Sequence, residues 1–470
     1  MSTISKNIFS SLFSSILQLY TGSVVFILLA KLMHVEDFGI LSFGFSLASI
    51  ATVVSDFGFS LMVIKDYPIY KNDFRPYFFN SVIIKILFGL LTFFFISIYV
   101  VSIYDGSWVY VGLIYCVFAI FGSFVTYFQA LFKVQNNFNK FLKSGAVYAF
   151  FISLSVFFYW YLSLDLKTLV VLFLASRLFQ LLYCILINKI SLIPFNRYIE
   201  LNILKRILIK SWSYGAHTIL GILYFMVDTQ IISIYFGGKE VALYQSIFRI
   251  ILIFLVFSEL ITNVFLPYLS YKFYKKEDIS ELSSKIFLYL LIIGLSLFLF
   301  FNTFKSFILS TLYNDNYLEA GILVLPLSVV VVIRTVSSLL GNLMTVSNNQ
   351  SNRVIAVCVS LFFSISLNLI FTPLYGIIAA AWINVIVHFV LFFLYLFYTK
   401  KEFQRINIFN EHFFFLILGA MCIYICQQLF NQYVVDFALV GIWILIIFLV
   451  MKSNQNYNYL KCILNENGVG

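Results

Sequence analysis

Long apolar stretches separated by short polar segments run along the whole chain. Each is long enough, at about 18 residues or more, to cross a hydrocarbon core as a helix. The stretches are continuous, whereas strands of a membrane β-barrel alternate apolar and polar residues over about ten positions. The pattern therefore predicts an all-α polytopic membrane protein. We place fourteen spans, with the last two least firmly delimited, at 11–33, 38–62, 77–103, 108–132, 142–163, 167–188, 212–236, 240–268, 284–308, 318–344, 352–374, 376–398, 412–430 and 434–451.

Positive charges are concentrated in alternate loops, and this asymmetry predicts the orientation of the spans. If the N-terminus is inside, the inner loops and ends carry 22 Lys and Arg residues. The outer ends carry only Lys31, Lys167, Lys239 and Lys305. Lys and Arg near span ends stay cytoplasmic, so both termini are predicted to be cytoplasmic. The net charge of +10 is spread over many short loops, which argues against nucleic-acid binding.

Catalytic signatures are weak throughout the sequence. The predicted outer loops are short, and the four histidines show no metal-ligand spacing. No Ser-His-Asp grouping or glycine-rich phosphate loop is visible. The six cysteines lie mostly within spans and suggest no disulfide framework. These patterns predict a protein that is not an enzyme and that has neither a metal site nor a bound cofactor.

Four cations lie well inside apolar spans, namely Lys85, Arg177, Arg249 and Arg334. A charged side chain at the bilayer centre costs roughly 2.5–3.5 kcal/mol even on the lenient insertion scale. Such residues therefore face a partner or a polar cavity. We identify the four as candidate ligands of an anionic substrate.

Two of these cations have an acidic residue at a similar depth on the neighbouring helix. Helix rise places Asp56 level with Lys85 and Asp228 level with Arg249. A structural ion pair and a substrate-binding role stay open for both pairs.

Arg177 and Arg334 have no level acid in their own hairpins. Glu259 is the remaining acid deep in a span, and it is a candidate to neutralise either arginine or to bind a coupling ion. The depth argument therefore favours Arg177 and Arg334 as the substrate-facing cations.

Weak internal repetition predicts two lobes. A shift of 203 positions aligns Leu32–Gly39 with Tyr235–Ala242, and a shift of 212 aligns Val134–Asn137 with Val346–Asn349. We predict two six-helix lobes related by a pseudo-two-fold axis and followed by two further helices. The expected divisions are a first lobe at 1–190, a cytoplasmic connection at 191–211, a second lobe at 212–400, helices 13 and 14 at 401–451 and a cytoplasmic tail at 452–470.

Several short motifs together resemble a known transporter family. They are Met33–Ser42 continuing to Asp56-Phe57-Gly58, Asp228 ahead of Ala242-Leu243-Tyr244, and Leu367-Asn368-Leu369-Ile370 leading through Pro373-Leu374-Tyr375-Gly376. These stretches resemble the polysaccharide-exporter branch of the multidrug/oligosaccharidyl-lipid/polysaccharide superfamily, the Wzx-type O-antigen flippases. The sequence departs from the pattern after Gly238, where Lys-Glu-Val-Ala replaces a second small residue.

The resemblance implies a flippase in the bacterial inner membrane. Its expected substrate is an undecaprenyl-pyrophosphate-linked oligosaccharide, an O-antigen or capsule repeat unit, carried by alternating access through a cationic cavity between the lobes. Expected partners are the lipid bilayer, a polysaccharide polymerase and a chain-length regulator. H⁺ or Na⁺ coupling stays open, with Asp228 and Glu259 as candidates. The alternatives are a lipid II flippase, a drug/cation antiporter of the same superfamily and, among enzymes, a membrane polysaccharide polymerase.

Overall fold

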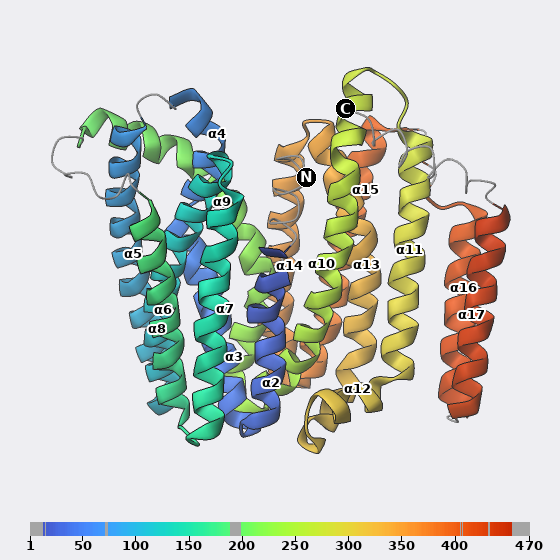
Figure 1. Ribbon diagram of the computed structural model, residues 1–470. Coiled ribbons are helices and arrows are strands. Elements are labelled where there is room, and N and C mark those ends of the chain that lie inside the picture. Colours follow the sequence, from blue (N-terminus) through green and yellow to red (C-terminus); the bar gives the residue numbers. More distant parts are fainter. Residues whose placement is uncertain are drawn as a thin grey trace. The chain divides into compact units, whose positions relative to one another are not determined.

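The computed structural model describes residues 13–453 apart from residues 15, 71–73, 189–198, 405, 407 and 431–432. Within this part of the chain all regular structure is helical (Figure 1), as the sequence predicted. The elements are η1 Tyr20–Val24, α2 Val25–Leu32, α3 Val35–Asp56, α4 Phe59–Tyr70, α5 Arg75–Ile103, α6 Gly106–Val134, α7 Phe138–Tyr161, α8 Leu166–Ile187, α9 Leu201–Tyr235, α10 Gly238–Tyr274, α11 Ser280–Thr303, α12 Lys305–Leu312, η5 Asp315–Ala320, α13 Gly321–Val346, α14 Gln350–Tyr375, α15 Ile377–Glu402, α16 Glu411–Phe430 and α17 Tyr433–Ser453.

Each predicted span overlaps a helix within the described residues. Twelve helices in the described residues are long and apolar enough to cross a membrane. Shorter apolar helices at Ile16–Leu32 and Ala438–Lys452 lie where the first and last spans were predicted. The protein is therefore a multi-pass membrane protein.

The second predicted span, 38–62, is wrong at its C-terminal end. Helix α3 stops at Asp56, because Phe57 and Gly58 both adopt positive φ, at 44° and 76°. A Cβ atom on Gly58 would lie 2.4 Å from the backbone nitrogen of Gly215, so only glycine fits this close approach to α9. The chain then continues as the short helix α4. The ninth span, 284–308, likewise ends early, at Thr303.

The helices form two compact units. The first contains Met1–Ile253, Ser310–Ala320 and Val357–Ile383, and the second contains Phe254–Leu309, Gly321–Ala356 and Asn384–Gly470. In the first unit α3 is the central helix and packs against α5, α6 and α9. In the second unit α11 packs against α13 and α16, and α16 packs against α17. The two lobes inferred from repetition remain a prediction. Residues 191–198 of the predicted connection, and the tail beyond residue 453, lie outside the described residues, and the rest of the connection leads into α9, which begins at Leu201.

Small residues on α3 allow close helix packing in the first unit. A Cβ atom on Gly39 would lie 1.8 Å from the carbonyl oxygen of Gly238, and one on Gly238 would lie 2.5 Å from the carbonyl oxygen of Glu36. The first turns of α3 and α10 therefore touch backbone to backbone, as small residues permit between membrane helices. Val35 and Gly238, which begin these two helices, are aligned by the sequence shift of 203.

Candidate functional site

Lys85 forms the ion pair that depth matching predicted. Its ammonium nitrogen lies 2.7 Å from Oδ1 of Asp56 and is fully buried. The same carboxylate accepts hydrogen bonds from the backbone nitrogen and the hydroxyl of Ser60, in the first turn of α4. Asp56, the last residue of α3, is therefore bonded both to α4, through Ser60, and to α5, through Lys85. Lys85 is held by protein groups, and its surroundings indicate a structural role.

The variant Lys85→Met is expected to destabilise the protein by about 3–5 kcal/mol, because it leaves the Asp56 carboxylate buried without its cation. Thermal unfolding in detergent would measure the loss. The double variant Lys85→Met/Asp56→Leu should recover much of the stability. Equal melting temperatures for Lys85→Met and the parent protein would contradict the assignment.

Arg249 does not form the predicted ion pair with Asp228. Its Nη1 instead donates a 2.7 Å hydrogen bond to the carbonyl oxygen of Gly22, within the π-helical turn η1. The guanidinium carbon lies 4.1 and 4.2 Å from the ring centres of Phe26 and Phe45, so the cation is held between two aromatic rings. The side chain is buried.

The rotation of α10 about its axis explains why Arg249 does not reach Asp228. Tyr244, rather than Arg249, faces Asp228, and its hydroxyl donates a 2.9 Å hydrogen bond to Oδ2 of that carboxylate. Positions five residues apart on a helix project about 140° apart. Equal depth on neighbouring helices therefore did not bring Arg249 and Asp228 together.

Asp228 lies in a buried polar network. Its Oδ1 accepts hydrogen bonds from Nδ2 of Asn368 at 3.0 Å and from the hydroxyl of Ser364 at 3.3 Å. Thr372, one turn beyond Asn368, donates to Oδ1 of that amide at 2.7 Å. In the sequence, Asn368 and Tyr244 stood out only as parts of family-like motifs. The sequence signal for this network is the four-residue spacing of Ser364, Asn368 and Thr372 on α14, of which the first two contact the Asp228 carboxylate and the third contacts Asn368.

Arg177 lies on α8 without a carboxylate partner in the described residues. Its Nη1 donates a 2.7 Å hydrogen bond to Oε1 of Gln180. Its guanidinium carbon lies 3.9 Å from the ring centre of Tyr148 and 4.5 Å from that of Phe118. Gln180 is fixed in turn by a hydrogen bond to the Ser144 carbonyl. The aromatic rings and the amide hold the guanidinium, and Arg177 as a whole residue is partly exposed.

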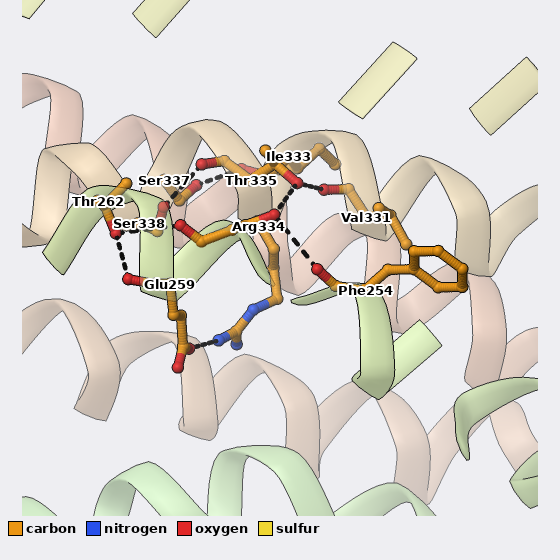
Figure 2. A network of polar contacts seen from close by, with 10 residues as sticks. Phe254, Glu259, Thr262, Val331, Ile333, Arg334, Thr335, Ser337 and Ser338 are labelled. Carbon is orange, nitrogen blue, oxygen red and sulfur yellow. Dashed lines mark hydrogen bonds and ion pairs between the residues drawn. The ribbon is translucent and has the colours of Figure 1, made fainter. Parts of the chain in front are cut away.

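Arg334 is paired with Glu259, the acid that the sequence left unassigned. Figure 2 shows the guanidinium pointing towards the Glu259 carboxylate, and Nη2 lies 3.4 Å from Oε1. The side chains are 16% and 55% exposed. A long ion pair that is open to solvent contributes only about 0–1 kcal/mol. Arg334 can therefore exchange this partner for another anion at little cost.

Exposure divides the four cations into two pairs. Lys85 and Arg249 are buried among protein groups, whereas Arg177 and Arg334 are partly exposed. The two less buried cations are the two arginines that the depth argument favoured as substrate-facing. Arg334 nevertheless has an acidic neighbour, Glu259, which comes from another hairpin.

Comparisons with known proteins give one family and a consistent fold. Residues 4–273 match the family described as "Polysaccharide biosynthesis protein". A structure of the lipid II flippase MurJ in an inward closed conformation is 17% identical, with a TM-score of 0.70 over 97% of this chain and 99% of that one. An inward-facing multidrug resistance MATE transporter of the MOP superfamily is 12% identical, with a TM-score of 0.66 over 83% and 95%. No curated protein is significantly similar in sequence. At these identities the structural likeness establishes the fold.

Proposed function

Because this chain belongs to the polysaccharide biosynthesis protein family, we propose that it is a flippase that moves a lipid-linked oligosaccharide across the membrane. The finer proposal is an undecaprenyl-pyrophosphate-linked repeat unit of O-antigen or capsule, moved from the cytoplasmic to the periplasmic leaflet of a bacterial inner membrane. A polysaccharide polymerase and a chain-length regulator would then act on the exported unit. The solved structures with the same fold are transporters and flippases, which supports transport over catalysis.

The observation that carries this proposal is the pair of partly exposed arginines inside membrane-spanning helices. Arg177 lies on α8 and Arg334 on α13, one in each predicted lobe. A pyrophosphate is the polar anionic part of the substrate that must cross the bilayer. Guanidinium groups stay charged at any physiological pH and bind phosphate oxygens in a fixed geometry. We propose that these two arginines bind the pyrophosphate as the lobes alternate their access.

A drug/cation antiporter is less well supported by the same residues. A cationic drug needs an accessible carboxylate in the spans. Among the described residues deep in spans, Asp56 is paired with Lys85, and Asp228 is buried and accepts several hydrogen bonds. Glu259 is exposed, but the positive charge of Arg334 beside it disfavours a cationic ligand there. The lipid II flippase remains the second candidate, because the MurJ structure covers 97% of this chain.

We propose Asp228 as the residue that couples transport to H⁺ or Na⁺. Its carboxylate accepts hydrogen bonds from the hydroxyl groups of Tyr244 and Ser364 and from Nδ2 of Asn368. Carboxylate and hydroxyl oxygens suit a hard cation, and a carboxylate can also take up a proton. Glu259 is the weaker candidate, because its side chain is largely exposed.

A flipping assay tests the proposal. Spheroplasts that lack the gene should accumulate lipid-linked oligosaccharide on the inner leaflet, and the restored gene should make it accessible from outside. Imposed H⁺ and Na⁺ gradients in the same assay identify the coupling ion, and Asp228→Asn should lose the response. Normal surface exposure of the glycan lipid without the gene would exclude the flippase function.

A further inference from the structure

A polar pocket lies at the ends of the first-unit helices that are predicted to face outside. Its volume is about 580 Å³. The first turns of α3 and α6, the last turn of α7 and the loop before α8 surround it. The residues that line it are Leu32, His34, Asp37, Ser107, Tyr159, Trp160, Ser163, Leu164, Asp165, Leu166 and Lys167. This volume lies within the usual range of small-molecule sites, about 300–1,000 Å³.

The polar side chains of this pocket are largely available to a ligand. Within the described residues, no protein hydrogen bond or ion pair involves the Asp37 carboxylate, the His34 ring or the Tyr159 hydroxyl. Asp165 caps α8 through one oxygen, Oδ1, which accepts from the backbone nitrogen of Thr168 at 3.2 Å and from its hydroxyl. The second oxygen stays available. The Thr168 hydrogen bonds lower the pKa of Asp165, so this carboxylate is charged at neutral pH.

Two carboxylates, Asp37 and Asp165, converge in the pocket, and neither forms an ion pair within the described residues. The His34 ring acts electrostatically on Asp37 more strongly than Asp165 does, and Lys167 acts on Asp165. Both carboxylates also act on the Tyr159 hydroxyl. The adjacent Lys167 is directed to the ring of Tyr110, with its nitrogen 5.8 Å from the ring centre. A second negative charge disfavours an anionic ligand. The described residues also contain no group of three His, Cys, Asp or Glu side chains suited to a metal ion.

Hydroxyl-rich ligands fit this arrangement. Ionised carboxylates accept hydrogen bonds only, and sugar hydroxyl groups donate them. Tyr159 and Trp160 add an aromatic surface, and Trp160 is 60% exposed. An aromatic ring has an electron-rich face that attracts the C–H bonds of a sugar ring, while the indole N–H and phenol O–H still donate hydrogen bonds.

We propose that this pocket binds a saccharide, namely sugar residues of the translocated glycan as they reach the outer side. The inference rests on the proposed flippase function and adds a glycan-binding site separate from the arginines. Asp37 and Asp165 accept hydrogen bonds from ring hydroxyl groups, and Trp160 packs against the sugar face. Such a site would hold the head group on the outer side and favour forward transport.

Binding to the purified full-length protein tests this proposal. The probe is the repeat-unit oligosaccharide released by mild acid from the lipid-linked intermediate of the host strain, titrated by calorimetry and observed by saturation-transfer NMR. The double variant Asp37→Asn/Asp165→Ser should weaken binding at least about tenfold, since each position loses a charge-assisted hydrogen bond, which is stronger than one between neutral groups. Serine keeps the helix cap at position 165. Trp160→Leu should weaken binding and remove the aromatic contact signal.

The matched control is Glu36→Gln, which removes the same charge one residue away from Asp37 but outside the pocket lining. It should bind like the parent protein. No saturable binding by the parent protein, or equal weakening by Glu36→Gln, would overturn the proposal. Loss of co-purified phosphatidylethanolamine from the double variant, with saccharide binding intact, would instead identify a lipid head-group site. Flipping by the parent protein is measured in a separate assay. A parent protein that flips the glycan lipid but binds no saccharide in this pocket would contradict the pocket proposal alone, and the flippase proposal would stand.

Discussion

Cells that carry Arg334→Ala or Arg177→Ala are expected to show at least about tenfold less surface polysaccharide, with normal amounts of protein in the membrane. A guanidinium–phosphate contact contributes about 1.5–3 kcal/mol, enough to change a rate or an affinity by tenfold or more. Polysaccharide would be quantified by gel staining in a deletion strain that expresses each variant. Membrane abundance would be followed by immunoblot. Arg177→Lys should retain part of the activity, because it keeps the charge but loses the planar donor pair.

The pair of Arg334 and Glu259 permits a sharper version of this test. If Arg334 binds substrate, Glu259→Gln should be tolerated, and the double variant Arg334→Ala/Glu259→Ala should remain inactive. If Arg334 only neutralises Glu259, removing both charges should restore export, as in a double-mutant cycle. Arg353→Ala is the matched control, since that arginine lies in the first turn of α14 and donates to the hydroxyl of Thr345, in the last turn of α13. Full export by both single arginine variants would exclude their substrate role.

Gly39→Val is expected to abolish export and to lower stability. A Cβ atom at position 39 would overlap the carbonyl oxygen of Gly238, at a distance of 1.8 Å, so the first turns of α3 and α10 must separate. Overpacking of this kind typically costs about 1–3 kcal/mol, and here the obstacle is backbone, which cannot rotate away. Export should be lost as well, because separating these two helix ends disturbs the packing of the first unit around α3. Export and thermal unfolding in detergent would measure the two effects.

Gly221→Ala is the matched control for this substitution. Gly221 lies inside α9, and an added Cβ atom would meet nothing within 4 Å. Alanine there should leave export unchanged and slightly favour the helix, by up to about 1 kcal/mol. Suppose that Gly39→Val exported polysaccharide and melted like Gly221→Ala. The backbone contact between α3 and α10 would then contribute neither to stability nor to transport.

The helical architecture could be predicted well because its cause is local. A continuous apolar run has to become a helix in lipid, since each backbone polar group must be satisfied within its own segment. The break at Phe57 and Gly58 was missed for the opposite reason. The positive φ values there depend on the close approach of Gly215 from α9, and no apolar pattern records such a contact.

The sequence by itself determined the class of protein, the positions of its helices and the identity of the cations that lie at membrane depth. It also placed Lys85 beside Asp56. Only the tertiary structure decided the partners of Arg249 and Arg334, because pairing depends on the rotation of each helix about its axis as well as on depth. Exposure of Arg177 and Arg334 was likewise a tertiary result. Burial is set by neighbours that are distant in sequence, and burial separates the cations that hold the fold from those proposed to hold a substrate.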